Sequence, residues 1–147
     1  IIKYNINMLD IEDFKKKLDK KSRLMGIDPG KKRVGIAISD ENKIIATPYT
    51  TIIKSDYLKF VNEIKAIFEE NDIKGIVIGN PINMDGTASK SSQSAKDLAI
   101  NLSKDITENV TLWDERLSTV AAEKSLISSE RTSYKLDNLS IEYLGSH

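Results

Sequence analysis

The chain has 147 residues, with 22 basic and 22 acidic side chains and a formal net charge of zero. This length predicts one domain with a sizeable core, and the neutral charge excludes a globally positive surface for nucleic acid. The lack of cysteine excludes disulfides and thiolate metal sites, and the single histidine, His147, argues against a histidine-based mechanism. Neither a secretory signal nor a membrane-length apolar run is evident, so we expect a cytoplasmic protein that does not enter a membrane.

The apolar periodicity predicts a short N-terminal extension followed by one domain. We assign residues 1–22 to the extension, where Asp10 is expected to cap a short helix, and residues 23–147 to the domain. Period-two stretches in the domain predict strands, and apolar stripes at helical spacing predict helices. The expected strands are 24–29, 33–39, 44–53, 74–79 and 110–113, and the expected helices are 55–70, 89–107, 117–128 and 136–144.

The order of these elements predicts an α/β fold built on a five-stranded mixed sheet flanked by helices on both faces. Three consecutive strands favour an antiparallel meander, and the later alternation of strand and helix favours parallel strands joined by right-handed crossovers. Ligands of open sheets bind where parallel strands end. Asp28, the loop from residue 80 to 87 and the pair Asp114-Glu115 each follow a predicted strand, so we expect a functional site at this edge.

The first candidate for chemistry is Asp28, at the end of an apolar strand. It is followed by the turn Pro29-Gly30 and by the basic residues Lys31, Lys32 and Arg33. A carboxylate at the end of an apolar strand needs a partner, and a basic turn beside it suits a metal ion and a phosphate. The alternative is a hairpin in which Asp28 only caps the turn, because Asp before Pro-Gly is common turn chemistry.

Further acids follow the last predicted strand and open the last predicted helix, namely Asp114, Glu115 and Asp137. Mg²⁺ is held in proteins by a few carboxylates together with substrate phosphate, and two such ions can promote phosphodiester hydrolysis. Zinc is not expected, because no His/Cys cluster is present. Asp114 and Asp137 also fit as acids at helix N-termini, and Arg116 either contacts a phosphate or pairs with a neighbouring carboxylate.

The segment Gly79–Thr87 is a second candidate, as a loop between a strand and a helix. Its backbone amides, together with Ser89, Lys90, Ser91 and Ser92 at the start of the next helix, suit a phosphate. Asp85 is a further candidate ligand. The alternative is an ordinary connection in which Ser89 caps the helix.

Three segments together resemble the motifs of the YqgF (RuvX) family, in the family's order and spacing, over about residues 23–140. They are Gly26–Gly35, Gly79–Thr87 and Leu112–Ala122. The resemblance implies a ribonuclease H-like fold related to the RuvC Holliday junction resolvases. It also implies a nuclease that uses Mg²⁺ (or Mn²⁺) and matures the 5′ end of pre-16S ribosomal RNA. The implied catalytic and metal-binding residues are Asp28, Glu115 and Asp137, with Asp114 as a further ligand.

The implied partners are structured RNA, DNA junctions and ribosomal precursor particles, and the chain would act as a monomer or a homodimer. The residues that we expect to contact nucleic acid are Lys31, Lys32, Arg33, Asn83 and Arg116. The sequence departs from the family pattern around Asp137. Residues 129–135 are less basic than in the family, and Ser140-Ile141 replaces an alanine pair.

Other functions stay open on the sequence alone. The same site could cut four-way DNA junctions, which needs symmetric incisions and predicts a stable dimer. A catalytically weak RNA-binding or ribosome-assembly factor would still bind RNA after the loss of Asp28. A nucleotide-binding module resembling one half of an actin-like ATPase is disfavoured, because those proteins bind ATP between two such domains.

Overall fold

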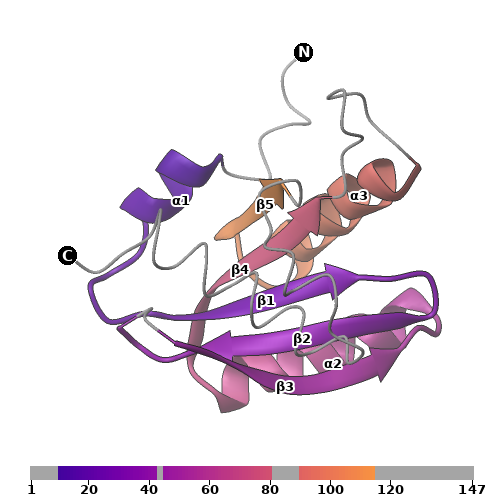
Figure 1. Cartoon of the computed structure of the whole chain (residues 1–147), viewed down its shortest axis with the longest axis horizontal. Coiled ribbons are helices and arrows are strands. Elements are labelled where there is room, and N and C mark those ends of the chain that lie inside the picture. Colours follow the sequence, from indigo (N-terminus) through magenta and orange to yellow (C-terminus); the bar gives the residue numbers. More distant parts are fainter. Residues whose placement is uncertain (1–9, 43–44, 81–89, 115–147) are drawn as a thin grey trace.

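The computed structural model describes residues 10–42, 45–80 and 90–114, which form a mixed sheet with three helices (Figure 1). The sheet has five strands in the order β3-β2-β1-β4-β5. β2 pairs antiparallel with β1 and β3, whereas β4 pairs parallel with β1 and β5. In chain order the elements are α1 (Ile11–Lys16), β1 (Arg23–Pro29), β2 (Arg33–Ser39), β3 (Ala46–Ile53), α2 (Tyr57–Glu70), β4 (Ile73–Asn80), α3 (Lys90–Asp105) and β5 (Val110–Asp114).

This architecture confirms the predicted α/β fold class with its five-stranded mixed sheet. The five strands and the two longer helices of the described ranges begin and end within two residues of the predicted bounds. The helices expected at 117–128 and 136–144 lie outside the described residues. None of the described helices is long and apolar enough to cross a membrane.

Two helices, α2 and α3, cover one face of the sheet, which we call the α2–α3 face (Figure 1). The larger hydrophobic core lies beneath them, because successive strand residues alternate between the faces and the apolar ones gather here. α2 begins after its N-cap Asp56, whose carboxylate accepts a hydrogen bond from the backbone N–H of Lys59 at 2.9 Å. The buried stripe of α2 consists of Phe60, Val61 and Ile64.

The opposite face, which we call the α1 face, carries the short helix α1. As predicted, Asp10 is its N-cap, and the Asp10 carboxylate accepts a hydrogen bond from the backbone N–H of Asp13 at 2.8 Å. Phe14 of α1 is fully buried and belongs to a second core cluster with Leu24 and Trp113. The domain boundary after residue 22 stays a prediction, but α1 packs on the sheet and contributes to its core.

Candidate active site

Asp28 lies at the carboxyl end of β1 with its side chain half-buried. It pairs across β1 and β2 with Gly35. On the other side of β1, Ile27 pairs with Ile78 of β4, so Gly79 is the next β4 residue beside Asp28. Because glycine carries no side chain, neither paired position on the neighbouring strands adds a side chain beside the Asp28 carboxylate.

Alternation along β1 places Asp28 on the α1 face. Leu24 belongs to the core cluster of that face, whereas Ile27 belongs to the core of the α2–α3 face. Asp28, an even number of residues from Leu24, therefore shares the face of Leu24. Side chains alternate between the two faces along β5 as well: Leu112 packs against the core of the α2–α3 face, and Trp113 belongs to the cluster of the α1 face.

The parallel strands β1, β4 and β5 end at a common edge of the sheet. β4 and β5 run in register to their last residues, where Gly79 pairs with Trp113 and Asn80 pairs with Asp114. Asp28 and Asp114 lie in the last two residues of β1 and β5 at this edge, whereas the loop expected there after Asn80 lies outside the described residues. Within these residues, no group of three or more His, Cys, Asp or Glu side chains could hold a metal ion.

The remaining predicted site residues lie outside the described ranges. These are Asn83, Asp85, Ser89, Glu115, Arg116 and Asp137. Their assigned roles, and the catalytic roles of Asp28 and Asp114, stay predictions.

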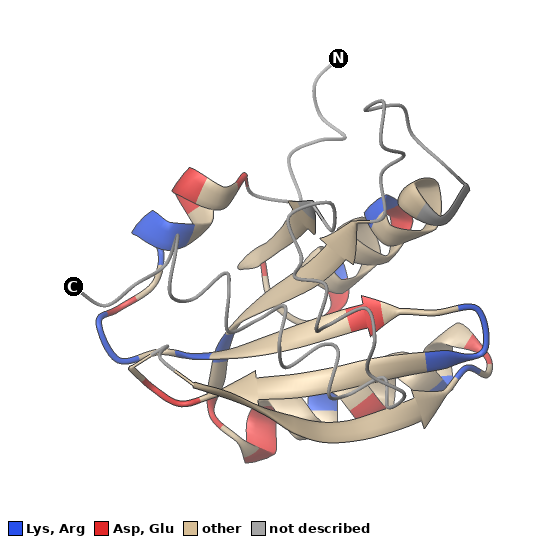
Figure 2. Cartoon of the chain, viewed as in Figure 1, with Lys and Arg blue, Asp and Glu red and all other residues tan. Residues whose placement is uncertain are grey.

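The turn between β1 and β2 presents a basic surface next to Asp28. The Gly30 backbone N–H donates to the Arg33 carbonyl at 3.0 Å and closes the turn. A side chain at Gly30 would collide with that same carbonyl oxygen, so the turn requires glycine at this position. Lys31, Lys32 and Arg33 are exposed around it, and Figure 2 shows the basic residues at this end of the β1–β2 hairpin.

Lys54 joins this surface from a separate part of the chain, directly after β3. Its ammonium donates to the Gly30 carbonyl at 3.2 Å, and its backbone N–H donates to the Lys32 carbonyl at 2.8 Å. We call Lys31, Lys32, Arg33 and Lys54 together the basic turn. The sequence motifs do not predict Lys54 as part of this surface. The signal that can place it here is the pairing of β2 with β3 in the predicted meander.

Asn80 and Ser92 hold the two ends of the connection between β4 and α3. Both side chains are buried, and the Ser92 hydroxyl donates to Asn80 Oδ1 at 2.7 Å. The sequence pattern predicts Asn80 in the loop, but Asn80 is the last residue of β4. This hydrogen bond joins the end of β4 to the first turn of α3.

The fold and this edge define an α/β protein with a half-buried carboxylate beside a basic turn, at the edge where parallel strands end. Residues 22–143 match the RuvX family, described as a Holliday junction resolvase, and the chain belongs to this family.

Curated relatives agree with this assignment. The chain is 51% identical over 115 residues to a protein of Pelagibacter ubique named "Putative pre-16S rRNA nuclease", covering 78% of this chain and 76% of that one. A protein of Ruegeria pomeroyi with the same name is 40% identical over 138 residues, covering 91% and 90%. Among solved structures, T. thermophilus RuvC in complex with Holliday junction substrate has a TM-score of 0.48 at 12% identity, over 82% of this chain and 94% of that one.

Proposed function

We propose that this chain is a nuclease that hydrolyses phosphodiester bonds, and that its substrate is the 5′ end of pre-16S ribosomal RNA. Membership of the RuvX family and the names of the two relatives support this proposal. The structural observation that carries it is the position of Asp28. Its carboxylate lies at the carboxyl edge of the sheet, with glycine on both neighbouring strands and a basic turn directly after it.

The basic turn binds the RNA backbone in this mechanism. Lys31, Lys32 and Arg33 are exposed and are separated from Asp28 by two to four residues. Contacts from such side chains to phosphate oxygens give affinity and orientation but little sequence choice. The basic turn would therefore hold the strand with one phosphate facing Asp28. Although the chain has no net charge, the basic turn gathers four positive charges at the place where the RNA phosphates would bind.

Asp28 also suits a divalent metal ion, which we propose as the cofactor in the form of Mg²⁺ or Mn²⁺. Carboxylate oxygens are the ligands that these hard cations prefer, and the flanking glycines add no side chain beside the carboxylate. When bound, the ion would stabilise the charge of the phosphate and lower the pKa of an attacking water molecule. Glu115 and Asp137 are the partner ligands implied by the family motifs.

The acid that acts with Asp28 is taken from the pair Asp114-Glu115. The family motifs imply Glu115 as a catalytic and metal-binding residue and Asp114 as a further ligand. We therefore propose Glu115 as the principal ligand, with Asp114 as the alternative. Metal binding that is lost in Glu115→Gln and kept in Asp114→Asn would support this choice, and the reverse pattern would overturn it.

The decisive experiment is cleavage of a precursor 16S 5′ segment with Mg²⁺ present or chelated. The wild type is compared with Asp28→Asn and with Asp72→Asn. Asp72 is an exposed acid at the other end of the sheet, before β4, so its substitution makes the same chemical change away from the site. We expect cleavage by the wild type and by Asp72→Asn but not by Asp28→Asn. RNA binding without cleavage by the wild type would instead identify an RNA-binding assembly factor.

A second candidate function is the resolution of four-way DNA junctions, which the description of the RuvX family favours. This reaction needs two symmetric incisions and therefore two copies of the site. A four-way junction assayed in parallel separates the two functions. Paired cuts in the junction by a dimeric protein would make the resolvase the better assignment, and cleavage confined to the RNA would exclude it.

We also propose ribosomal precursor particles as the partner and the cytoplasm as the compartment, since both follow from a role in rRNA processing. Sedimentation of the chain with precursor particles from a cell extract, and its release by ribonuclease treatment, would test the association.

A further inference from the structure

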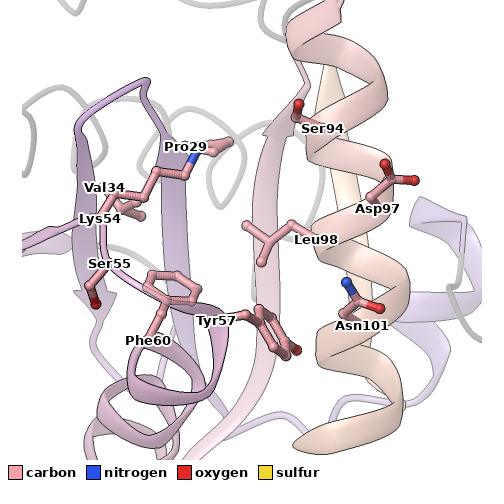
Figure 3. A pocket seen from close by; sticks show the side chains of 10 residues that line it. All are labelled: Pro29, Val34, Lys54, Ser55, Tyr57, Phe60, Ser94, Asp97, Leu98 and Asn101. Atoms are coloured by element: carbon pink, nitrogen blue, oxygen red, sulfur yellow. The ribbon is translucent and has the colours of Figure 1, made fainter.

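A cleft lies between α2 and α3, on the face of the sheet opposite Asp28 (Figure 3). It encloses about 260 Å³. Its inner walls are apolar, with Phe60 and Tyr57 from α2 facing Leu98 from α3 in Figure 3. Pro29 and Val34, at the facing ends of β1 and β2, also line it. The cleft is smaller than a pocket for a drug-sized ligand, and its walls suit one flat aromatic group.

We propose that this cleft binds one unpaired nucleobase of the RNA strand whose backbone contacts the basic turn. The proposal rests on the function proposed above and adds a base-binding subsite to it. Single-stranded RNA is commonly recognised by bases that leave the stack and pack against aromatic side chains. Tyr57, which is 39% exposed, supplies such a surface here, with the nearly buried ring of Phe60 beside it, and Leu98 closes the opposite wall.

The cleft adjoins both the candidate active site and the basic turn. Asp28 and Pro29 are consecutive residues, and alternation along β1 sends Asp28 to the α1 face and Pro29 to the α2–α3 face. Lys54 lines the cleft and also donates to the Gly30 carbonyl in the turn. An RNA strand that bends around the end of β1 would therefore meet Asp28, the basic turn and the cleft in succession.

Charge complementarity favours RNA as the occupant. Lys54 lines the cleft and is hydrogen-bonded to Gly30 and Lys32 of the turn, so the basic turn adjoins the cleft where the phosphate of an inserted nucleotide would be. Hydrogen-bonding groups stand along the α3 side of the cleft. Asp97 and Asn101 lie one helical turn apart on α3 and are both exposed. Asn101 offers a donor and an acceptor to a base edge, and Asp97 offers an acceptor.

The polar groups also predict which base is preferred. The Asp97 carboxylate, which accepts a hydrogen bond from the side-chain amide of Gln93 at 3.0 Å, has further acceptor capacity. The exocyclic amino group of adenine can donate to it, whereas the one donor on the pairing edge of uracil, N3–H, stands between two carbonyl oxygens that the carboxylate would repel. We therefore expect the cleft to favour adenine over uracil.

The test measures binding of labelled single-stranded oligo(A) and oligo(U) hexamers by fluorescence anisotropy in the presence of a chelator. Leu98→Trp fills the cleft with an indole. Leu58→Trp is the matched control, because Leu58 is an exposed α2 residue that does not line the cleft. We expect Leu98→Trp to weaken oligo(A) binding by about tenfold, the loss of one stacked base, and Leu58→Trp to leave it unchanged. Equal affinity of Leu98→Trp and wild type would overturn the proposal.

A second pair of variants keeps the test valid if Leu98→Trp disturbs folding. Asn101→Ala removes a rim hydrogen-bonding group, and Asn62→Ala makes the same change at an exposed α2 position outside the cleft. Weaker oligo(A) binding in Asn101→Ala alone supports the subsite, and equal effects of both variants overturn it. Because binding is measured in chelator, it is independent of cleavage. If the cleft variants weaken binding but cleavage does not depend on Asp28, only the proposed nuclease function is refuted. If cleavage depends on Asp28 but the cleft variants bind normally, only the base-binding subsite is refuted.

Discussion

The hydroxyl of Ser92 donates a hydrogen bond to Oδ1 of Asn80 at 2.7 Å, with both side chains buried. Asn80 is the last residue of β4, and Ser92 lies in the first turn of α3. The bond therefore joins the two ends of the segment that contains the second family motif. Such a buried pair favours one placement of β4 relative to α3, because any other placement would leave the Asn80 amide buried without a hydrogen bond, at a cost in folding free energy.

Replacement of Ser92 by alanine should destabilise the protein through this contact. The Asn80 amide oxygen would stay buried without the hydroxyl that donates to it, which costs about 1–3 kcal/mol. Ser94→Ala is the control, because Ser94 is exposed on the same helix. Urea denaturation of the two variants measures the difference. A free energy of unfolding that falls equally in both would show that the Asn80 contact contributes nothing particular.

Gly75 of β4 should not tolerate alanine, because α1 lies directly above it. A Cβ at this position would stand 2.7 Å from Cζ of Phe14 and 3.2 Å from Cδ2 of Leu24. Overpacking of a buried site costs about 1–3 kcal/mol. Phe14→Leu removes the ring and should relieve part of this cost in the double variant. Thermal denaturation of the wild type, the two single variants and the double variant gives the coupling energy between positions 75 and 14. If the two losses of stability simply add in the double variant, a direct clash with Phe14 is contradicted.

The sequence predicted the sheet well because its strands carry strong local signals. The alternation of Val34, Ile36 and Ile38 with small residues marks β2, and the order of elements then restricts the topology. The carboxyl edge followed from that topology, so Asp28 could be placed without any tertiary information. The cap of α1 by Asp10 was also visible, because capping depends on residues three apart.

The packing of α1 and the cleft could not be predicted in the same way. Residues 1–22 were assigned to an extension, since nothing local shows that Phe14 packs beneath α1 against Leu24 and Gly75. The cleft depends on how Phe60 and Leu98, from two helices far apart in the sequence, face each other. Such contacts arise from helix packing, which periodicity alone does not specify.

The basic turn should determine the salt dependence of RNA binding. Each phosphate contact that is lost lowers the slope of log affinity against log salt by about 0.7 for single-stranded nucleic acid. We expect this reduction in Lys32→Ala and not in Lys65→Ala, whose exposed lysine lies on α2 outside the cleft and the basic turn. Binding to a single-stranded RNA is measured over a range of salt concentrations. Equal slopes for wild type and Lys32→Ala would exclude a phosphate contact at this lysine.

Tyr57 should make stability depend on pH in the alkaline range. Its hydroxyl donates to Asp105 Oδ2 at 2.8 Å, which joins the start of α2 to the end of α3. Partial burial, and then this hydrogen bond and the charge of Asp105, raise the pKa of the Tyr57 phenol well above its usual value. A raised pKa means that the protonated phenol favours folding. Its contribution is complete below about pH 10 and is lost as the pH rises further.

Tyr57→Phe tests this linkage. Since the pair is partly exposed, we expect a loss of at most about 1 kcal/mol in the free energy of unfolding near neutral pH. The difference from wild type should shrink at strongly alkaline pH, because the wild type loses its advantage there. Tyr49→Phe, which removes an exposed phenol from β3, serves as the control. If the stability lost in Tyr57→Phe instead grew as the pH rose, the protonated phenol would not be the form that stabilises the fold.

A divalent metal ion should stabilise the folded protein through Asp28. A ligand that binds only the native state raises the free energy of unfolding by about 2.7 kcal/mol at a hundredfold excess over its Kd. Mg²⁺ or Mn²⁺ should therefore raise the Tm of the wild type, and chelation should reverse the increase. Asp28→Asn should lose most of this response because it removes one carboxylate ligand, whereas Asp72→Asn should keep it. A metal response that persists in Asp28→Asn would place the ion elsewhere, whatever that variant does to cleavage.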